Sequence, residues 1–271
     1  MVGVFRNLCL LVAMDSLTKV IGGGFVMGSP SFNLEYLMAL HSMLRKAFKN
    51  PAVFAIEYTL VPTTQYPTQP HEVLNGYAQV LHVAKSKDII CLMGDSAGGT
   101  LALTLLRDLK TQQAKHLDIL DQLPALVILI SPWVTLVSDN HQESASDYVS
   151  VSRLHQFAQL YAPDKMRGGV LDKASPASMI HHNWKAHTPK FGYIVWQGED
   201  EVLAKDISAM VHHLMELGVP IHVEKRPAGS RSLHVWPIIS FFLGGNQERR
   251  LEEMRVFAHA ITQVMYNAED S

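Results

Sequence analysis

Residues 89–99 read Ile-Ile-Cys-Leu-Met-Gly-Asp-Ser-Ala-Gly-Gly, and this stretch decides the fold. The apolar residues at its start have the composition of a buried strand, and the residues that follow it carry apolar positions at helical spacing. Gly94 and Gly98 lack side chains, so the chain can turn from strand to helix within a few residues around Ser96. A serine at the tip of such a turn is typical of a catalytic nucleophile. The alternative is a glycine-rich turn with an inert serine.

The bulk composition is that of one globular domain. The chain has 271 residues, of which 48% are hydrophobic and 18% charged, so residues 1–271 are expected to form a single α/β domain with a sizeable core. A formal net charge of −2 indicates no nucleic-acid partner and no broad attraction to an anionic membrane. No apolar run reaches the roughly 18 residues that a membrane-spanning helix needs.

The cysteines indicate no disulfide framework. The chain has two, Cys9 and Cys91, and neither belongs to a spacing that is typical of zinc ligands. This usage is compatible with a reducing compartment, and we therefore expect the protein in the cytoplasm. The oligomeric state is left open by the sequence.

Strand-like and helix-like segments alternate along the chain. Expected strands lie at 18–21, 52–58, 88–93, 125–130, 191–196 and 220–224, and expected helices lie at 34–48, 71–86, 97–113, 203–217 and 247–267. This alternation predicts a doubly wound, mostly parallel sheet with helices on both faces.

Residues 134–188 interrupt the alternation between two expected core strands. This polar segment, which we call the insertion, is rich in histidine and contains short helical pieces. Insertions at this point of an α/β fold often cover the active site, and we expect a lid, with a surface excursion as the alternative. His181, His182 and His187 do not have the spacing of metal ligands, so no metal site is expected.

A serine hydroxyl needs a base within hydrogen-bonding reach and a carboxylate that orients the base. His234 follows the last expected strand, on a loop that can reach over the strand ends, and is the best candidate for the base. Glu199, Asp200 and Glu201 all follow the strand at 191–196, and residue chemistry does not choose among them.

The third requirement is a set of donors for the oxyanion. Gly22-Gly23-Gly24 follows an expected strand and offers backbone N–H groups with no Cβ to block a substrate. The N–H group of Ala97, directly after the candidate nucleophile, would complete this oxyanion hole.

These motifs resemble the hormone-sensitive-lipase-like branch of the α/β hydrolases, from about residue 18 to the C-terminus. The matching pieces are Gly22-Gly23-Gly24-Phe25 with Gly28-Ser29, Tyr58-Thr59-Leu60-Val61-Pro62, Tyr66-Pro67, Gly94-Asp95-Ser96-Ala97-Gly98-Gly99, Ser131-Pro132-Trp133, Glu201-Val202-Leu203 and His234-Val235-Trp236. The last two variants look like fungal members of the steryl-acetate type or of biosynthetic clusters.

The resemblance implies an esterase for small or medium acyl esters that uses neither a metal nor an organic cofactor. Because the acid of this family lies two residues before a leucine, the resemblance assigns it to Glu201, with Asp200 as the second choice. The oxyanion glycines of the family correspond to Gly23 and Gly24.

Two features depart from the family pattern. Ile21 stands where the family has a histidine before the glycines. About 20 residues precede residues 22–28, which we call the glycine loop. Two interpretations are open: either the sheet lacks an early edge strand and part of its lid, or the true start of the protein differs.

The sequence thus predicts a serine carboxylic-ester hydrolase that acts on a small-molecule, apolar ester through Ser96, His234 and Glu201. Two alternatives stay open. One is a non-catalytic binding protein on the same fold, and the other is an acyltransferase or cyclising enzyme of secondary metabolism that uses the same acyl-enzyme.

Overall fold

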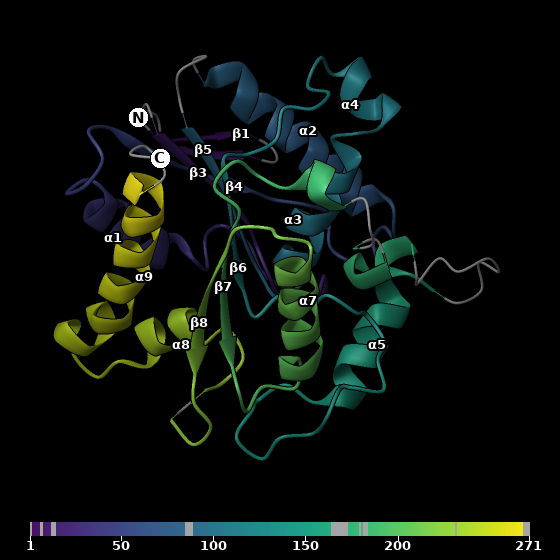
Figure 1. Ribbon diagram of the computed structural model, residues 1–271, viewed down its shortest axis with the longest axis vertical. Helices are drawn as coiled ribbons and strands as arrows, with labels where there is room; N and C mark the ends of the chain where they lie inside the picture. Colours follow the sequence, from purple (N-terminus) through teal and green to yellow (C-terminus); the bar gives the residue numbers. More distant parts are fainter. Residues whose placement is uncertain are drawn as a thin grey trace.

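A computed structural model describes the chain at residues 2–5, 8–11, 15–84, 89–163, 173–178, 180, 184–230 and 232–267. In these residues eight strands form one sheet in the order β1-β2-β4-β3-β5-β6-β7-β8 (Figure 1). The strands are β1 (Val2–Phe5), β2 (Leu8–Leu11), β3 (Asp15–Val20), β4 (Pro51–Ile56), β5 (Ile89–Asp95), β6 (Leu126–Ile130), β7 (Tyr193–Gly198) and β8 (Ile221–Arg226).

Six neighbouring strands of the sheet are parallel, as the alternation of segments predicts. In spatial order they are β4, β3, β5, β6, β7 and β8. β4 and β6 are buried at every position, because helices cover both faces of a parallel sheet. This burial explains why these strands read as continuous apolar runs rather than as alternating patterns.

The interpretation that an early edge strand is lost is wrong. β1 and β2 precede β3 and extend the sheet, β1 pairing antiparallel with β2 and β2 pairing antiparallel with β4. Antiparallel strands can be joined by a connection of two residues, so two four-residue strands need only a short stretch of chain. The few residues before the glycine loop are therefore enough for both strands.

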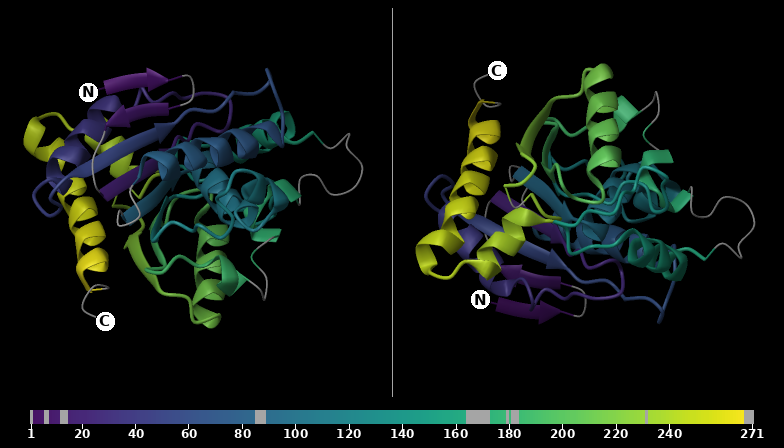
Figure 2. Two further views of the ribbon diagram at one scale, coloured as in Figure 1. Left: turned by 90° about the horizontal axis from the view of Figure 1, so that it is seen from above. Right: turned by 90° about the horizontal axis from the view of Figure 1, so that it is seen from below.

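The helices divide between the two faces of the sheet, which confirms the doubly wound arrangement (Figures 1 and 2). On one face lie α2 (Thr68–Val83), α3 (Ala97–Asp108) and α7 (Ala204–Glu216), and on the other lie α1 (Leu34–Leu44), α8 (Trp236–Leu243) and α9 (Gln247–Asn267). The short helix α4 (Gln112–His116) follows α3.

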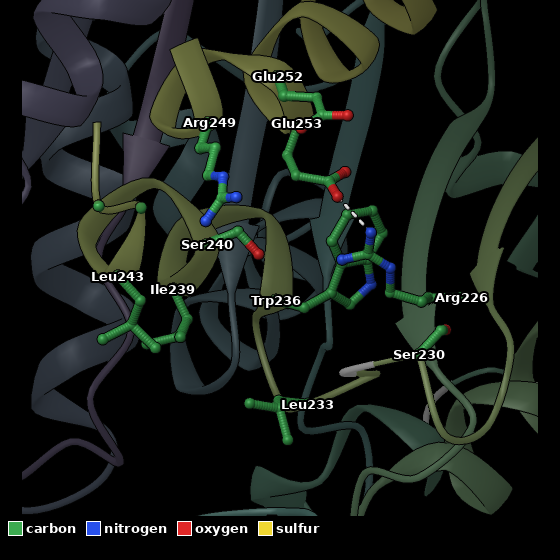
Figure 3. Close-up of a pocket in the computed structure, with 12 residues that line it drawn as sticks. Arg226, Ser230, Leu233, Trp236, Ile239, Ser240, Leu243, Arg249, Glu252 and Glu253 are labelled. Atoms are coloured by element: carbon green, nitrogen blue, oxygen red, sulfur yellow. Dashed lines mark hydrogen bonds and ion pairs between the residues drawn. The ribbon is translucent and has the colours of Figure 1, made fainter. Parts of the chain in front are cut away.

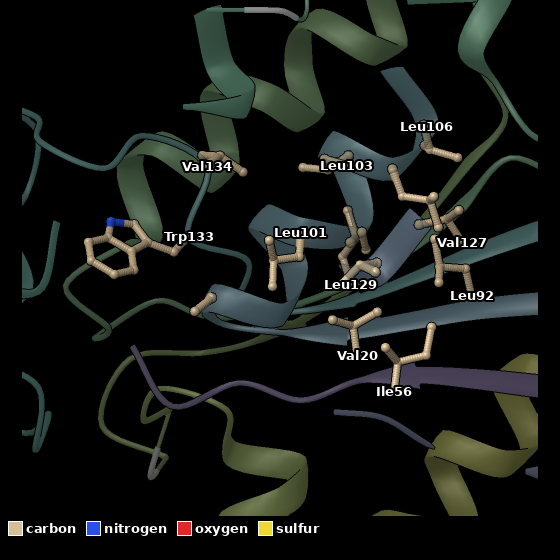
Figure 4. Packing of buried hydrophobic residues seen from close by; sticks show 14 of the residues in the cluster. Val20, Ile56, Leu92, Leu101, Leu103, Leu106, Val127, Leu129, Trp133 and Val134 are labelled. Atoms are coloured by element: carbon tan, nitrogen blue, oxygen red, sulfur yellow. The ribbon is translucent and has the colours of Figure 1, made fainter. Parts of the chain in front are cut away.

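The larger core cluster surrounds α3, which is buried along almost its whole length. Figure 4 shows Leu101, Leu103 and Leu106 of this helix beside apolar side chains of the strands, including Leu92 and Leu129. A helix that is apolar on nearly every side belongs in the interior of a domain. The helix that begins at the candidate nucleophile is thus held on several sides.

The segment between β6 and β7 contains α5 (Val151–Tyr161) and the 3₁₀ turns η1 (Pro176–Ser178) and η2 (Trp184–His187). It includes the insertion that the sequence analysis marks as a lid. Ala158 and Tyr161 of α5 are fully buried, and the Tyr161 ring stacks on Phe25 of the glycine loop with ring centroids 3.7 Å apart. His181 and His182 lie outside the described residues, and the ring of His187 stacks on Trp184.

The parallel strands bring four loops to one edge of the sheet. β3 leads into the glycine loop, and β5 leads into Ser96. β7 leads into the acidic residues 199–201, and β8 leads into the segment that carries His234. Ligand sites of open α/β sheets lie at the carboxyl ends of the strands. The topology therefore places every candidate catalytic group at one site.

We expect Leu103→Ala to lower the free energy of unfolding by about 2–5 kcal/mol, because Leu103 is fully buried in the α3 cluster and its loss leaves a cavity. The matched control is Leu243→Ala, which removes the same atoms from a side chain that is 74% exposed and should change stability by less than about 0.5 kcal/mol. Urea unfolding measures both, and equal effects would contradict the packing described.

Candidate active site

Ser96 lies between the last residue of β5 and the first of α3. Its φ of +51° and ψ of −121° are unusual for a residue with a side chain, and its N–H donates to the carbonyl of Ile130 at 3.0 Å. A Cβ on Gly94 would lie 2.4 Å from the carbonyl oxygen of Gly98, and a Cβ on Gly98 would lie 2.3 Å from that of Val20. Only glycines fit on both sides of the turn, which therefore holds the serine at its tip.

His234 connects Ser96 to Glu201. Its Nε2 lies 2.8 Å from Oγ of Ser96, and its Nδ1 lies 3.1 Å from Oε2 of Glu201. In the neutral tautomer that fits both contacts, Nδ1–H donates to the carboxylate and Nε2 accepts the hydroxyl proton of the serine. The structure thus brings together the three side chains that the sequence analysis selects.

The geometry separates the three neighbouring carboxylates. Only Glu201 meets the imidazole, while Glu199 binds the N–H of Ala228 at 3.0 Å and pairs with Lys225. Asp200 accepts the hydroxyl of Ser232 at 2.7 Å and the N–H of Gly229 at 2.6 Å. Glu199 and Asp200 therefore fasten the loop that carries His234, and Asp200, the second choice for the acid, bonds to that loop and not to the imidazole.

Glu201 is a buried carboxylate, 4% exposed. Burial raises its pKa, and the hydrogen bonds from His234, from the hydroxyl of Ser131 and from the N–H of Gly198 act in the opposite direction. Because these donors replace water, the carboxylate can stay ionised beside an imidazolium. This arrangement suits an acid that stabilises a positive charge on His234.

Ser131 is a site residue to which the sequence analysis gave no role. Its side chain is fully buried, donates to Glu201 and accepts the N–H of Val235 at 2.9 Å. Val235 has a φ of +49°, so the backbone bends sharply directly after His234. In the sequence Ser131 stands out only as part of the Ser131-Pro132-Trp133 motif, and nothing in that motif indicates a contact with the residue 104 positions further on.

The glycine loop lies beside Ser96. Gly23 and Gly24 have φ values of +119° and +62°, and both line the cavity that contains Ser96 and His234. Ala97 begins α3, and the first N–H groups of a helix have no partner within the helix. These positions fit the predicted oxyanion donors, whose role stays a prediction.

Two hydrogen bonds from one other segment hold the loop in place despite Ile21, which stands where the family has a histidine. The hydroxyl of Tyr58 donates to the carbonyl of Ile21 at 2.9 Å, and the N–H of Val61 donates to the carbonyl of Phe25 at 3.0 Å. Both donors belong to the Tyr58-to-Pro62 motif, which thus supports the backbone of the loop.

A buried ion pair joins the loop to the serine turn. Lys19 of β3 is fully buried and pairs with Asp95, the residue before Ser96. Asp95 also accepts the N–H of Gly22 at 3.2 Å. Burial lowers the pKa of Lys19 to about 7, and contact with a carboxylate opposes that change. The sequence did not predict this ion pair, because the position of a lysine inside an expected strand does not indicate which carboxylate it contacts.

The cavity above Ser96 measures about 590 Å³ and is mainly apolar. Leu154 and Phe157 of α5 line it, together with Ile238 and Phe242 of α8 and Met27 of the glycine loop. Arg153 and Tyr148 supply polar groups at its edge. A cavity of this size and character suits a small or medium apolar ligand.

A second cavity of about 380 Å³ lies beside α8 and shares Ile239 with the first (Figure 3). Its wall contains Arg226, which ion-pairs with Glu253 and stacks over the ring of Trp236 at 4.2 Å. These contacts fix the first turn of α8, two residues after His234, and none of Ser96, Glu201 and His234 lines this cavity.

The described residues contain no group of His, Cys, Asp and Glu side chains that could hold a metal ion. None of the helices in the same part of the chain has the length and apolar character of a membrane span.

Comparison with known proteins identifies the family. A family profile described as steryl acetyl hydrolase matches residues 16–243. The chain belongs to this family. The chain is an α/β hydrolase of the hormone-sensitive-lipase-type esterases, as the sequence motifs indicate.

This member of the steryl acetyl hydrolase family shares low sequence identity with individual relatives. An acetyl-hydrolase of Streptomyces hygroscopicus is 26% identical over 82% of this chain and 68% of its own length. The carboxylesterase/phospholipase LipF of Mycobacterium tuberculosis is 30% identical over 48% of this chain. The matched region covers 33% of that protein. An esterase/lipase from an uncultured bacterium shares the fold with a TM-score of 0.74 at 20% identity, over 100% of this chain and 85% of that one.

We expect Lys19→Met to lower the free energy of unfolding by about 3–5 kcal/mol, because the change leaves the carboxylate of Asp95 without its counter-charge. Asp95→Asn should also destabilise the protein, and the double variant should lose less than the sum of the two. Lys225→Met, at an exposed pair with Glu199, is the control and should cost less than about 1 kcal/mol. Additive effects of Lys19→Met and Asp95→Asn in urea unfolding would show that the two groups are not coupled.

Proposed function

We propose that this protein is a serine hydrolase of apolar carboxylic esters. The observation that carries the proposal is the continuous hydrogen-bonded chain from Ser96 through His234 to Glu201. Ser96 and His234 line an apolar cavity beside the glycine loop. The family supports ester hydrolysis as the general activity.

In the first half of the reaction, Oγ of Ser96 attacks the carbonyl carbon of the ester, and the hydroxyl proton passes to Nε2 of His234. Glu201 stabilises the resulting imidazolium through Nδ1–H. The N–H groups of Gly23, Gly24 and Ala97 are the proposed donors to the oxyanion. The tetrahedral intermediate then expels the alcohol, which takes its proton from Nε2, and the acyl group stays on Ser96.

In the second half, His234 removes a proton from water, and the hydroxide attacks the acyl carbon. Collapse of the second tetrahedral intermediate breaks the bond to Oγ and releases the carboxylic acid. Ser96 regains its proton from His234. One ester and one water thus give one acid and one alcohol, and no cofactor takes part in the proposed cycle.

The lining of the cavity supports an ester with an apolar acyl or alcohol group. Phe157 and Leu154 come from the insertion, so α5 forms one wall of the cavity. This position supports our proposal that the insertion acts as a lid over the substrate. The cytoplasm stays our proposed compartment, which microscopy of a fluorescent fusion tests.

Substitution of the nucleophile is the first test. Ser96→Ala removes the attacking oxygen and should abolish hydrolysis of p-nitrophenyl acetate and butyrate, without loss of the circular dichroism signal of the fold. A fluorophosphonate probe should label the unaltered protein and not this variant. A folded, unaltered protein that resists the probe would favour the binding-protein alternative, and product analysis with an added alcohol would separate acyl transfer from hydrolysis.

A second test distinguishes the carboxylates. Glu201→Gln should lower kcat on the order of 10⁴-fold, because an amide no longer stabilises the imidazolium or fixes the tautomer. Asp200→Asn is the matched comparison next to it, and its loss of kcat should be smaller, since Asp200 holds the loop of His234 through Gly229 and Ser232 and does not bond to the imidazole. A larger loss of kcat in Asp200→Asn than in Glu201→Gln would overturn the assignment.

A further inference from the structure

Asp147 of the insertion contacts both loops that carry the base and the acid of the proposed catalytic site. Its Oδ1 accepts the backbone N–H of His234 at 3.3 Å, and its Oδ2 accepts the backbone N–H of Val202, next to Glu201, at 3.0 Å. One carboxylate therefore bridges two segments that follow different strands of the sheet.

We infer that Asp147 is a positioning residue that sets the distance between His234 and Glu201. This inference rests on the proposed function, and it assigns to the insertion a role other than covering the substrate. Asp200 and Ser131 also tie the acid segment to the base segment, and Asp147 differs from them because it accepts the N–H of His234 itself.

The geometry of the two bonds suits this role. Glu201 and His234 lie 33 positions apart and approach each other through loops that enter the site from β7 and β8. A backbone N–H that donates to a carboxylate makes a stronger bond than one that donates to a neutral acceptor. Because the two oxygens of Asp147 take one N–H from each loop, the carboxylate restrains both backbones at once.

Asp147 is itself held in place. Its Oδ1 also accepts the N–H of Val149 at 3.4 Å, which folds the insertion back on the carboxylate. Upstream in the insertion, Asn140 donates to Asp206 at 2.7 Å and His141 lies 3.2 Å from the same carboxylate. Asp206 belongs to the first turn of α7, directly after the acidic loop. The insertion is thus fastened to the segment that it positions.

The charge of Asp147 lies close to the catalytic groups. The ring of Tyr148 lies 6.1 Å from that of His234. Burial raises the pKa of the Tyr148 hydroxyl, and the carboxylates of Asp147 and Glu201 raise it further. Both carboxylates therefore lie close to Tyr148, whose ring is a neighbour of the His234 ring.

Asp147→Asn tests the inference, since it keeps the shape of the side chain and leaves one oxygen to accept a single N–H. We expect kcat for p-nitrophenyl butyrate to fall about 10- to 100-fold, as for a small misplacement of a catalytic group, while KM changes little. The matched control is Glu143→Gln, which alters another carboxylate of the insertion that accepts a backbone N–H, that of Val151 at 2.9 Å. This control should keep the kcat of the unaltered protein.

Two measurements make the result independent of folding and of the assumed reaction. Titration of active serines with a fluorophosphonate corrects kcat for any unfolded fraction. The low-field proton resonance of Nδ1–H of His234, recorded without substrate, should shift or broaden in Asp147→Asn and stay in place in Glu143→Gln. If Asp147→Asn fails to fold, Asp147→Glu keeps the negative charge on a side chain that is one methylene longer. The corrected kcat and the His234 resonance are then measured in that variant.

The outcomes separate the two proposals. An unaltered kcat and an unaltered imidazole resonance in Asp147→Asn would overturn the inference while leaving ester hydrolysis intact. An unaltered protein without esterase activity or probe labelling would overturn the proposed function, and the resonance would still decide whether Asp147 positions His234. A fall in kcat of the same size in Glu143→Gln would show that any disturbed carboxylate of the insertion has this effect, and would also overturn the inference.

Discussion

Ser96 has a φ of +51°, a conformation that a serine keeps only where the surrounding structure enforces it. The enforcement comes from close contacts of backbone with backbone. Gly98 lies against the carbonyl of Val20, and Gly99 lies against Cβ and Cα of Pro132, so the strand, the helix and the next loop approach one another more closely than a larger residue would allow. The hydroxyl at the tip is thereby presented to His234. Every other part of the site is arranged around this fixed point.

The site is assembled from segments that each have a separate anchor. Asp95, beside the serine, binds both Lys19 and the N–H of Gly22, so the glycine loop and the serine turn share one buried ion pair. The loop of His234 is tied to the acidic loop through Asp200. Such ties matter because catalysis by preorganised dipoles needs donors and base in place before the reaction begins.

The insertion shows how a surface segment can take part in such an arrangement. Its helix α5 contributes Leu154 and Phe157 to the apolar wall, while the stretch before α5 contributes the Asp147 carboxylate. A change in this segment could therefore alter the choice of substrate and the rate of the chemical step separately, because different residues serve the two purposes.

The sequence alone determined the parallel sheet, the serine turn and the candidacy of Ser96 and His234, because periodicity, glycine spacing and chain order report local conformation and topology. It did not determine the edge strands β1 and β2, since short strands carry little periodic signal and take their conformation from pairing with β4. The choice of Glu201 over Asp200 rested on resemblance until the loop geometry decided it. Lys19, Ser131 and Asp147 became visible only in the tertiary structure, because their partners are distant in the chain and a contact between two such residues leaves no trace in either local sequence.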